Sequence, residues 1–257
     1  MEMLLNLIIY FFIYSFLGWV LESVYKSFLE KKLVNSGFLF GPICPIYGFG
    51  AIIMYLFLED VSSKPVIAFC LGFVILSIWE YIVGMVLEKI FHTKYWDYSK
   101  DKFNLQGRVC LKNSIFWGIL GVVFIDVIHP FVIELLNQVS SDLIMYIDIT
   151  FLLILFIDII VSVKNTISIA DKLKRVEELN RRIKEKAEEI KEKGKNFEIK
   201  NVSLQDALDE LKEKKDMITE KSYKSINRLK KAFPTLKSEQ ITNFLNERKE
   251  IFKNNKN

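Results

Sequence analysis

Five acidic residues lie within otherwise apolar stretches of this 257-residue chain: Glu22, Glu80, Asp126, Asp148 and Asp158. No Lys or Arg lies in the same stretches to neutralise them. A charged carboxylate at the centre of a membrane helix costs roughly 2.5–3.5 kcal/mol. We therefore expect these side chains to lie near an interface, to face a wet cavity or to stay protonated.

Glu22 and Glu80 are the acids best placed to form a binding site. Glu22 lies near the end of its helix, where Lys26 one turn later offers the alternative of an interfacial ion pair. Glu80 lies deeper, on a helical stripe that should face other helices because its members are small or polar: Ser77, Gly84 and Glu88.

Asp126, His129 and Asp148 form a second group at similar depth in the other half of the membrane. They are interpreted either as a proton relay or as members of a simple interhelical hydrogen bond. The chain has two histidines, His92 and His129, so a His-based metal site is not expected, and no cofactor is predicted.

The first of two longer motifs is NSGFLFGPICPIYGFG, residues 35–50. Its Gly-Pro and Cys-Pro pairs interrupt backbone hydrogen bonding at the entrance of an apolar run. Such backbone is tolerated at membrane depth only where protein or water surrounds it. The motif therefore indicates either a partly re-entrant entry carrying Tyr47 or a helix that begins at a proline and packs through small residues.

The second motif is KYWDYSKDKFNLQGRVCLKNSIFWG, residues 94–118, between two apolar segments. Its aromatic residues suit the interface, and its polar residues supply donors and acceptors around Gly107. The motif is either a loop that binds a polar group or a satisfied loop with an aromatic belt. With the first motif it predicts an acidic and aromatic substrate-binding vestibule formed by Trp19, Glu22, Tyr47, Glu80, Trp96, Asp97, Tyr98, Asn104, Gln106 and Arg108.

The elements that must position these residues are membrane helices. Apolar segments of about 20 residues predict five spans, which are 4–25, one within 33–58, 65–87, 114–135 and 143–163. The N-terminus shows no signal-peptide pattern, so the first span is expected to be retained. Basic loops alternate with loops poor in basic residues. The positive-inside rule therefore predicts a multi-pass plasma-membrane protein with its N-terminus outside and its C-terminus in the cytoplasm.

The average net charge of +4 conceals two different regions. Residues 1–163 carry a net charge of −4, and residues 164–257 carry +8. We predict an all-α protein, with a transmembrane domain over 1–163 and a charged helical tail over 164–257. Apolar residues at heptad spacing from Ile169 favour a helical hairpin or a dimeric coiled coil equally, and a solvated helix face laced with ion pairs is a further interpretation.

The long apolar stretches exclude a soluble globular protein for residues 1–163, and the composition excludes the collagen-like and disulfide-rich secreted classes. The odd number of cysteines, three, favours reduced thiols. The expected partners are the lipid bilayer, a separate ATPase subunit because the chain has no P-loop, and a second copy of the tail. No nucleic-acid partner is expected.

The stretches YSFLGWVLE, GFLFGPICPIYGFG and WDYSKDKFNLQGR together resemble the type IV ABC-transporter permease family (CmpB-like). The resemblance covers about residues 8–165 and implies a bacterial membrane protein with a role in transport, of unknown substrate. Two other functions fit the residues. One is a membrane sensor or scaffold that recruits partners through the tail. The other is an intramembrane lipid-modifying enzyme with Glu22 or Glu80 as acid or base and Arg108 holding phosphate. No catalytic signature is present, so an enzyme is the less favoured reading.

Overall fold

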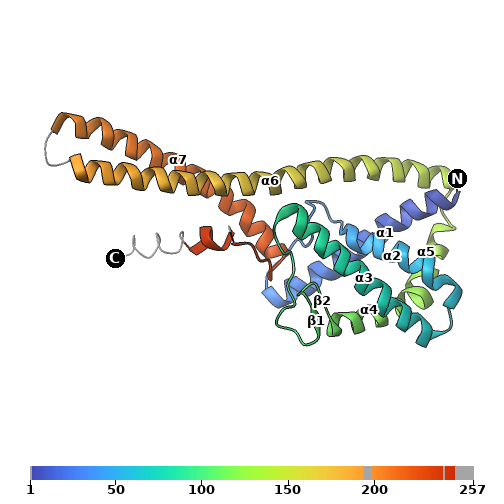
Figure 1. The fold of residues 1–257 in the computed structure, drawn as a ribbon. Coiled ribbons are helices and arrows are strands. Elements are labelled where there is room, and N and C mark those ends of the chain that lie inside the picture. The colour runs from blue at the N-terminus through green and yellow to red at the C-terminus, as the bar shows by residue number, and fades with distance from the viewer. Residues whose placement is uncertain (1, 194–197, 240, 247–257) are drawn as a thin grey trace. The chain divides into compact units, whose positions relative to one another are not determined.

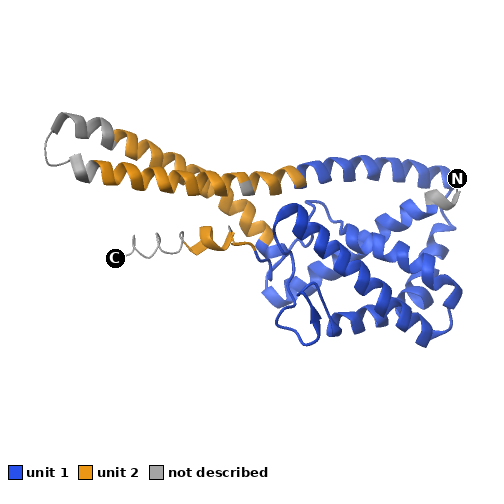
Figure 2. Cartoon of the chain, viewed as in Figure 1, with its two compact units in different colours: residues 1–162, 230–237 blue, residues 163–229, 238–257 orange. Residues whose placement is uncertain are grey.

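The structure is a computed structural model that describes residues 2–193, 198–239 and 241–246. The chain forms two compact units (Figure 2). Unit 1 comprises residues 1–162 and 230–237, and unit 2 comprises residues 163–229 and 238–257. The chain therefore returns to unit 1 for eight residues after most of unit 2 has been formed.

The described chain is almost entirely helical (Figure 1). One short antiparallel ladder joins β1 to β2. In chain order the elements are α1 (Glu2–Glu30), α2 (Pro45–Leu58), the 3₁₀ turn η1 (Glu59–Val61), α3 (Pro65–Phe91), β1 (Asn104–Leu105), β2 (Val109–Cys110), α4 (Leu111–Val123), the π-helical turn η2 (Phe124–Ile128), α5 (His129–Leu136), α6 (Ser141–Lys193) and α7 (Glu198–Ala232).

Four helical segments of the described chain are long and apolar enough to cross a membrane: 6–30, 65–91, 111–136 and 141–189. The protein is thus a helical, multi-pass membrane protein, as predicted. The count of five spans is not confirmed. The segment that differs is α2, whose 14 residues rise about 21 Å, less than the roughly 30 Å of a hydrocarbon core.

The chain ahead of α2 is not helical, because its prolines and glycines interrupt the helical ladder. α2 begins with Pro45 in its first turn, where the missing N–H costs nothing. The preceding backbone is held by Asp158 of α6, whose carboxylate accepts the N–H groups of Phe40 at 3.0 Å and Gly41 at 2.7 Å. Asp158 therefore supplies the hydrogen bonds that irregular backbone needs at membrane depth.

The apolar core of unit 1 forms between α1, α2, α3, α4 and α5, with the first turns of α6. Close approach of α3 and α4 depends on small residues. A Cβ atom on Gly72 would lie 3.1 Å from the carbonyl oxygen of Trp117 and 3.3 Å from the Cα of Gly121. Small residues that let backbones approach are the usual basis of helix packing in membranes.

Unit 2 consists chiefly of the second half of α6 and most of α7, which run antiparallel to each other (Figure 1). Ser225 of α7 donates to Asn165 of α6 at 3.4 Å. Three of the residues at heptad spacing in α6 are buried, as are three apolar residues of α7: Ile169, Leu173 and Val176 of α6, and Leu208, Ile226 and Leu229 of α7. The structure thus shows α6 and α7 as a helical hairpin within one chain (Figure 1).

Candidate functional site

Glu22 of α1 is the centre of a hydrogen-bonded group that we name the Glu22 network: Glu22, Lys26, Ser36 and Tyr47. The hydroxyl of Tyr47 donates to Oε1 of Glu22 at 3.0 Å. Lys26 Nζ and the Ser36 hydroxyl donate to Oε2 at 2.5 and 2.8 Å. The predicted ion pair with Lys26 is confirmed, and it is one part of a larger group that includes α2 and the segment before it.

Glu80 of α3 is the centre of a second group, the Glu80 network: Glu80, Tyr98 and Trp117. Its side chain is only 4% exposed. Tyr98 donates to one carboxylate oxygen at 3.1 Å, and the indole of Trp117 donates to the other at 2.9 Å. Each oxygen of this buried carboxylate therefore has a donor, as burial of a charged or polar group requires.

The two networks adjoin each other. The rings of Tyr47 and Trp117, one from each network, have centroids 5.9 Å apart. Burial raises the pKa of the Tyr98 hydroxyl well above its usual range, and the negative charges of Glu80 and Glu22 raise it further. Both carboxylates therefore act on one hydroxyl, which stays protonated and donates to Glu80.

The predicted stripe along α3 does face other parts of the protein. Ser77 donates to Ser114 of α4 at 2.7 Å, and Gly84 lies against Trp96 and Arg108. Arg108 binds Glu88 through Nε at 3.1 Å and Nη2 at 2.8 Å. The stripe on which Glu80 lies is thus packed against α4 and the loop 92–110, not against lipid.

Loop 92–110 is held by internal hydrogen bonds, and it places the Tyr98 hydroxyl next to Glu80. Asn104 accepts the N–H of Gly107 at 3.1 Å, and Gly107 has a φ of +72°. A side chain at Gly107 would collide with Asp97 and Ser99. Ser99 donates from its N–H to Asp97 at 3.1 Å. The polar residues around Gly107 therefore fix the conformation of the loop, and the Tyr98 side chain contacts Glu80 of α3.

Arg108 and its neighbours form a separate group. Besides its ion pair with Glu88, Arg108 lies over the ring of Tyr81, with its guanidinium carbon 5.3 Å from the centroid. Gln106 accepts hydrogen bonds from Arg108 and from the Tyr81 hydroxyl. The indole of Trp96 donates to the Arg108 carbonyl at 2.9 Å. The charge of Arg108 is thus paired with Glu88 and not with Glu22 or Glu80.

The ten predicted site residues divide accordingly. Four belong to the adjoining networks: Glu22, Tyr47, Glu80 and Tyr98. Five hold loop 92–110 or its contact with α3: Trp96, Asp97, Asn104, Gln106 and Arg108. Trp19 donates to Asn35 at 2.7 Å and joins neither network. Sequence reasoning missed Ser36 and Trp117 as partners of the acids, although both lie within or beside the quoted motifs.

The group in the other half of the membrane is less connected. His129 Nδ1 is 2.7 Å from the Tyr14 hydroxyl, among aromatic rings. Asp126 accepts the N–H of Ser63 at 3.1 Å. Asp148 is 1% exposed, and neither of its carboxylate oxygens has a partner in the described chain. No hydrogen bond among the described residues joins any two of Asp126, His129 and Asp148.

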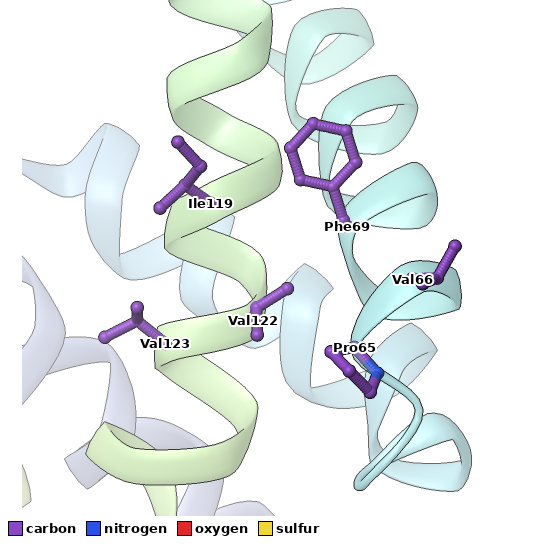
Figure 3. Close-up of a pocket in the computed structure, with 6 residues that line it drawn as sticks. All are labelled: Pro65, Val66, Phe69, Ile119, Val122 and Val123. Carbon is purple, nitrogen blue, oxygen red and sulfur yellow. The ribbon is translucent and has the colours of Figure 1, made fainter.

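A cavity of about 380 Å³ lies elsewhere, between α3 and α4 (Figure 3). Its lining is entirely apolar: Pro65, Val66, Phe69, Ile119, Val122 and Val123. Pro65 is 15 positions before Glu80, which corresponds to about 22 Å along a helix. The cavity therefore offers no polar group, and neither Glu22 nor Glu80 lines it. Within the described ranges, no cluster of three or more His, Cys, Asp or Glu side chains could hold a metal ion.

Comparison with known proteins gives one match. The family described as "Putative ABC-transporter type IV" matches residues 9–163, which include both networks and end at the first residue of unit 2. No curated protein and no solved structure matches the chain.

Proposed function

The chain belongs to the type IV ABC-transporter family, and we propose that it is the membrane subunit of a transport system in which the Glu22 and Glu80 networks bind the polar part of the substrate. The observation that carries this proposal is the meeting of two membrane carboxylates, from α1 and α3, in adjoining networks. Acidic residues in membrane helices commonly mark substrate or ion pathways. The chain has no P-loop, so a separate ATPase subunit drives transport.

The chemistry of the networks favours a cationic substrate or one rich in N–H and O–H donors. Glu22 accepts three donors and Glu80 accepts two, all from side chains of this protein. A ligand that replaces these donors must itself donate, because a buried carboxylate without donors is strongly disfavoured. Among the described residues, Lys26 is the one cation paired with either of the two acids, so a ligand amine or cation would complete the charge balance.

We propose that loop 92–110 lies in the cytoplasm and that the N-terminus lies outside. The basic residues of 26–37 and 88–113 support this orientation through the positive-inside rule. It requires that the chain cross the membrane between Lys32 and Glu59. Because α2 rises about 21 Å, the irregular segment 36–44 needs to add only about 9 Å to reach the roughly 30 Å of a hydrocarbon core, which its bent backbone of nine residues can supply. The five crossings are then four complete helices and one half-unwound span.

Reconstitution with the ATPase subunit that co-purifies from native membranes tests the proposal. Glu22→Gln and Glu80→Gln keep the size of each side chain and remove its charge, and both are expected to reduce nucleotide-dependent flux at least tenfold. Asp126→Asn is the matched control, because Asp126 is a membrane acid outside both networks. Equal flux in all three variants, or a native preparation with no ATPase, contradicts the proposal.

A sensor or scaffold function is favoured by one observation, which is that all of unit 2 after its first residue lies outside the family match. A protein in which a flexible Gly/Ser linker replaces residues 163–229, so that residues 230–237 of unit 1 are kept, separates the alternatives. Full flux without residues 163–229 supports transport by unit 1, and loss of partner recruitment with flux retained supports an added scaffold role. The enzyme alternative has less support, because the Arg108 expected to hold phosphate is bound to Glu88.

A further inference from the structure

The eight residues 230–237, which we name the strap, belong to unit 1 although the chain on either side of them belongs to unit 2 (Figure 2). The strap contains the last residues of α7 and the turn that follows. Its Ala232 and Leu236 are buried, at 1% and 6% exposure. The strap thus contributes two buried apolar side chains to unit 1.

The strap is bound to loop 92–110 by its backbone and by its charge. Lys237 and Lys94 form an antiparallel bridge in which each N–H donates to the other carbonyl at 2.9 Å. The Lys237 ammonium also forms an ion pair with Asp97, whose side chain is 3% exposed. The N–H of Asp97 donates to the Thr235 hydroxyl at 3.3 Å. These contacts specify one register of the strap on the loop.

The other end of the strap contacts the Glu22 network directly. Lys26 Nζ donates to the Ala232 carbonyl at 2.6 Å and lies 5.1 Å from the centroid of the Phe233 ring. Phe233 also packs against Tyr95, with ring centroids 4.9 Å apart. Lys26 is also the cation paired with Glu22 and a donor to Ser36. One ammonium group therefore joins the strap to the candidate site.

We propose that the surface formed by Lys26, Lys94, Tyr95 and Asp97 is a docking site for the strap, and that the docked strap closes the Glu22 network by holding Lys26 in place. When the strap leaves, Lys26 loses the Ala232 carbonyl and the Phe233 ring, and the network opens to water on the side of loop 92–110. The closure role rests on the proposed function of that network. The strap lies outside the family match, so it adds a control element to the family's membrane domain.

Charge reversal at Lys237, the exposed partner of Asp97, tests the docking. The protein in nanodiscs is treated with a membrane-impermeant N-hydroxysuccinimide ester, and the rate of Lys26 modification is measured by mass spectrometry. Lys237→Asp places two like charges together and is expected to raise the Lys26 rate about fivefold or more. Lys237→Arg keeps the ion pair and leaves the Asp97 bond to Ser99 untouched, so it should keep the rate of the unmodified chain. Lys32, exposed in its pair with Glu30, is the internal reference.

A disulfide provides a second, independent arm. Residues 94 and 237 are a hydrogen-bonded antiparallel pair, a geometry with Cα atoms about 5.5 Å apart that suits a disulfide. Lys94→Cys with Lys237→Cys, in a chain whose three native cysteines are replaced by Ala, is compared oxidised and reduced. Oxidation should protect Lys26, and reduction should expose it. An unchanged rate in Lys237→Arg and the protection of Lys26 in the oxidised form also show that the variants fold.

The results separate this inference from the transport proposal. A Lys26 rate that is the same in all variants and in both redox states overturns the docking site, whatever the flux. A Lys26 rate that follows the strap while Glu22→Gln transports normally keeps the docking site and removes the transport role of Glu22. A locked strap that leaves both Lys26 protected and flux undiminished overturns the closure role.

Discussion

Two groups of polar side chains lie in the membrane unit, and they differ in how completely they are hydrogen-bonded. On the side of loop 92–110, Glu22 and Glu80 accept five hydrogen bonds from donors on α1, α2, α4 and the connecting segments. In the other half, His129 has one bond through its ring, and Asp148 is buried with no partner among the described residues. Carboxylates thus occur in both groups, but Glu22 and Glu80 accept several hydrogen bonds whereas Asp148 accepts none from the described residues.

The difference shows what a carboxylate needs in order to be kept inside a membrane protein. Donors for Glu80 come from positions 18 and 37 residues away, so several elements must converge to satisfy it. Removing a satisfied acid leaves several buried donors without an acceptor, whereas removing an unsatisfied acid removes only a desolvation cost. Substitutions of the two groups should therefore change stability in opposite directions.

Glu80→Leu should have the largest effect. It leaves the Trp117 indole and the Tyr98 hydroxyl buried without an acceptor, and we expect it to lower the free energy of unfolding by about 3 kcal/mol. Unfolding by SDS titration in mixed micelles measures this. Glu80→Gln, which keeps an acceptor oxygen, should lose less than half as much. Equal losses for Leu and Gln would contradict the hydrogen-bonded role of the carboxylate.

Asp148→Leu should act in the opposite direction. The substitution removes a buried carboxyl that has no partner in the described chain, and we expect unfolding to become about 1–2 kcal/mol less favourable. The same titration gives the comparison with Glu80→Leu directly. A clear loss of stability would mean that Asp148 has a bound ligand or water that stabilises it, and would remove the contrast between the two groups.

Tyr14→Phe tests the single bond of His129. The ring and its packing are kept, and only the hydroxyl that bonds His129 at 2.7 Å is lost. Hydrogen bonds between membrane helices average about 0.6 kcal/mol, so a loss of about that size is expected. Tyr10→Phe is a matched control, because its ring also packs on His129 but no hydrogen bond of Tyr10 to His129 exists in the described chain. A loss equal in both variants would assign the effect to packing.

The smallest effect should be the pH dependence of the strap. Burial alone raises the pKa of the Asp97 carboxyl, but hydrogen bonds from Lys237 and Ser99 outweigh it, so its pKa lies below the ordinary value of 3.8. The stabilisation of the docked strap is therefore complete above about pH 4 and is lost as pH falls through the lower, folded-state pKa. Hydrogen exchange at the Lys94 and Lys237 amides, corrected for intrinsic rates, measures the change. Asp97→Asn should abolish it, and an unchanged pH profile in Asp97→Asn would show that another group titrates.

Much of the membrane architecture could be predicted from the sequence because hydropathy and helix-breaking residues act locally. Four predicted spans correspond to the four long apolar helices, and Pro45 begins α2. The second span is the exception, and the reason is again local: hydropathy predicts a span there, but helix-breaking residues interrupt its first part. An uncharged run from residue 33 to residue 58 reads as one membrane segment, but its first part cannot form helical hydrogen bonds and depends on Asp158 of α6 instead.

The candidate site was predicted less completely, because side-chain partners are chosen across the fold. Glu22, Tyr47, Glu80 and Tyr98 do meet in adjoining networks, but Arg108 is bound by Glu88, and Asp97 shapes its loop and binds Lys237. No local pattern distinguishes an arginine directed to a ligand from one directed to a neighbouring carboxylate. Whether the predicted residues bind substrate stays a prediction.

The sequence by itself determined that this is a helical membrane protein of a transporter family with a differently charged C-terminal region. Length, hydropathy and loop charge are sums over neighbouring residues, so no tertiary information is needed to read them. Only the tertiary structure decided that Lys26 is shared between Glu22 and residue 232, which lies 206 positions later in the chain. A contact between residues so far apart in the chain depends on how two distant segments pack, and it cannot be predicted from the types of the two residues alone.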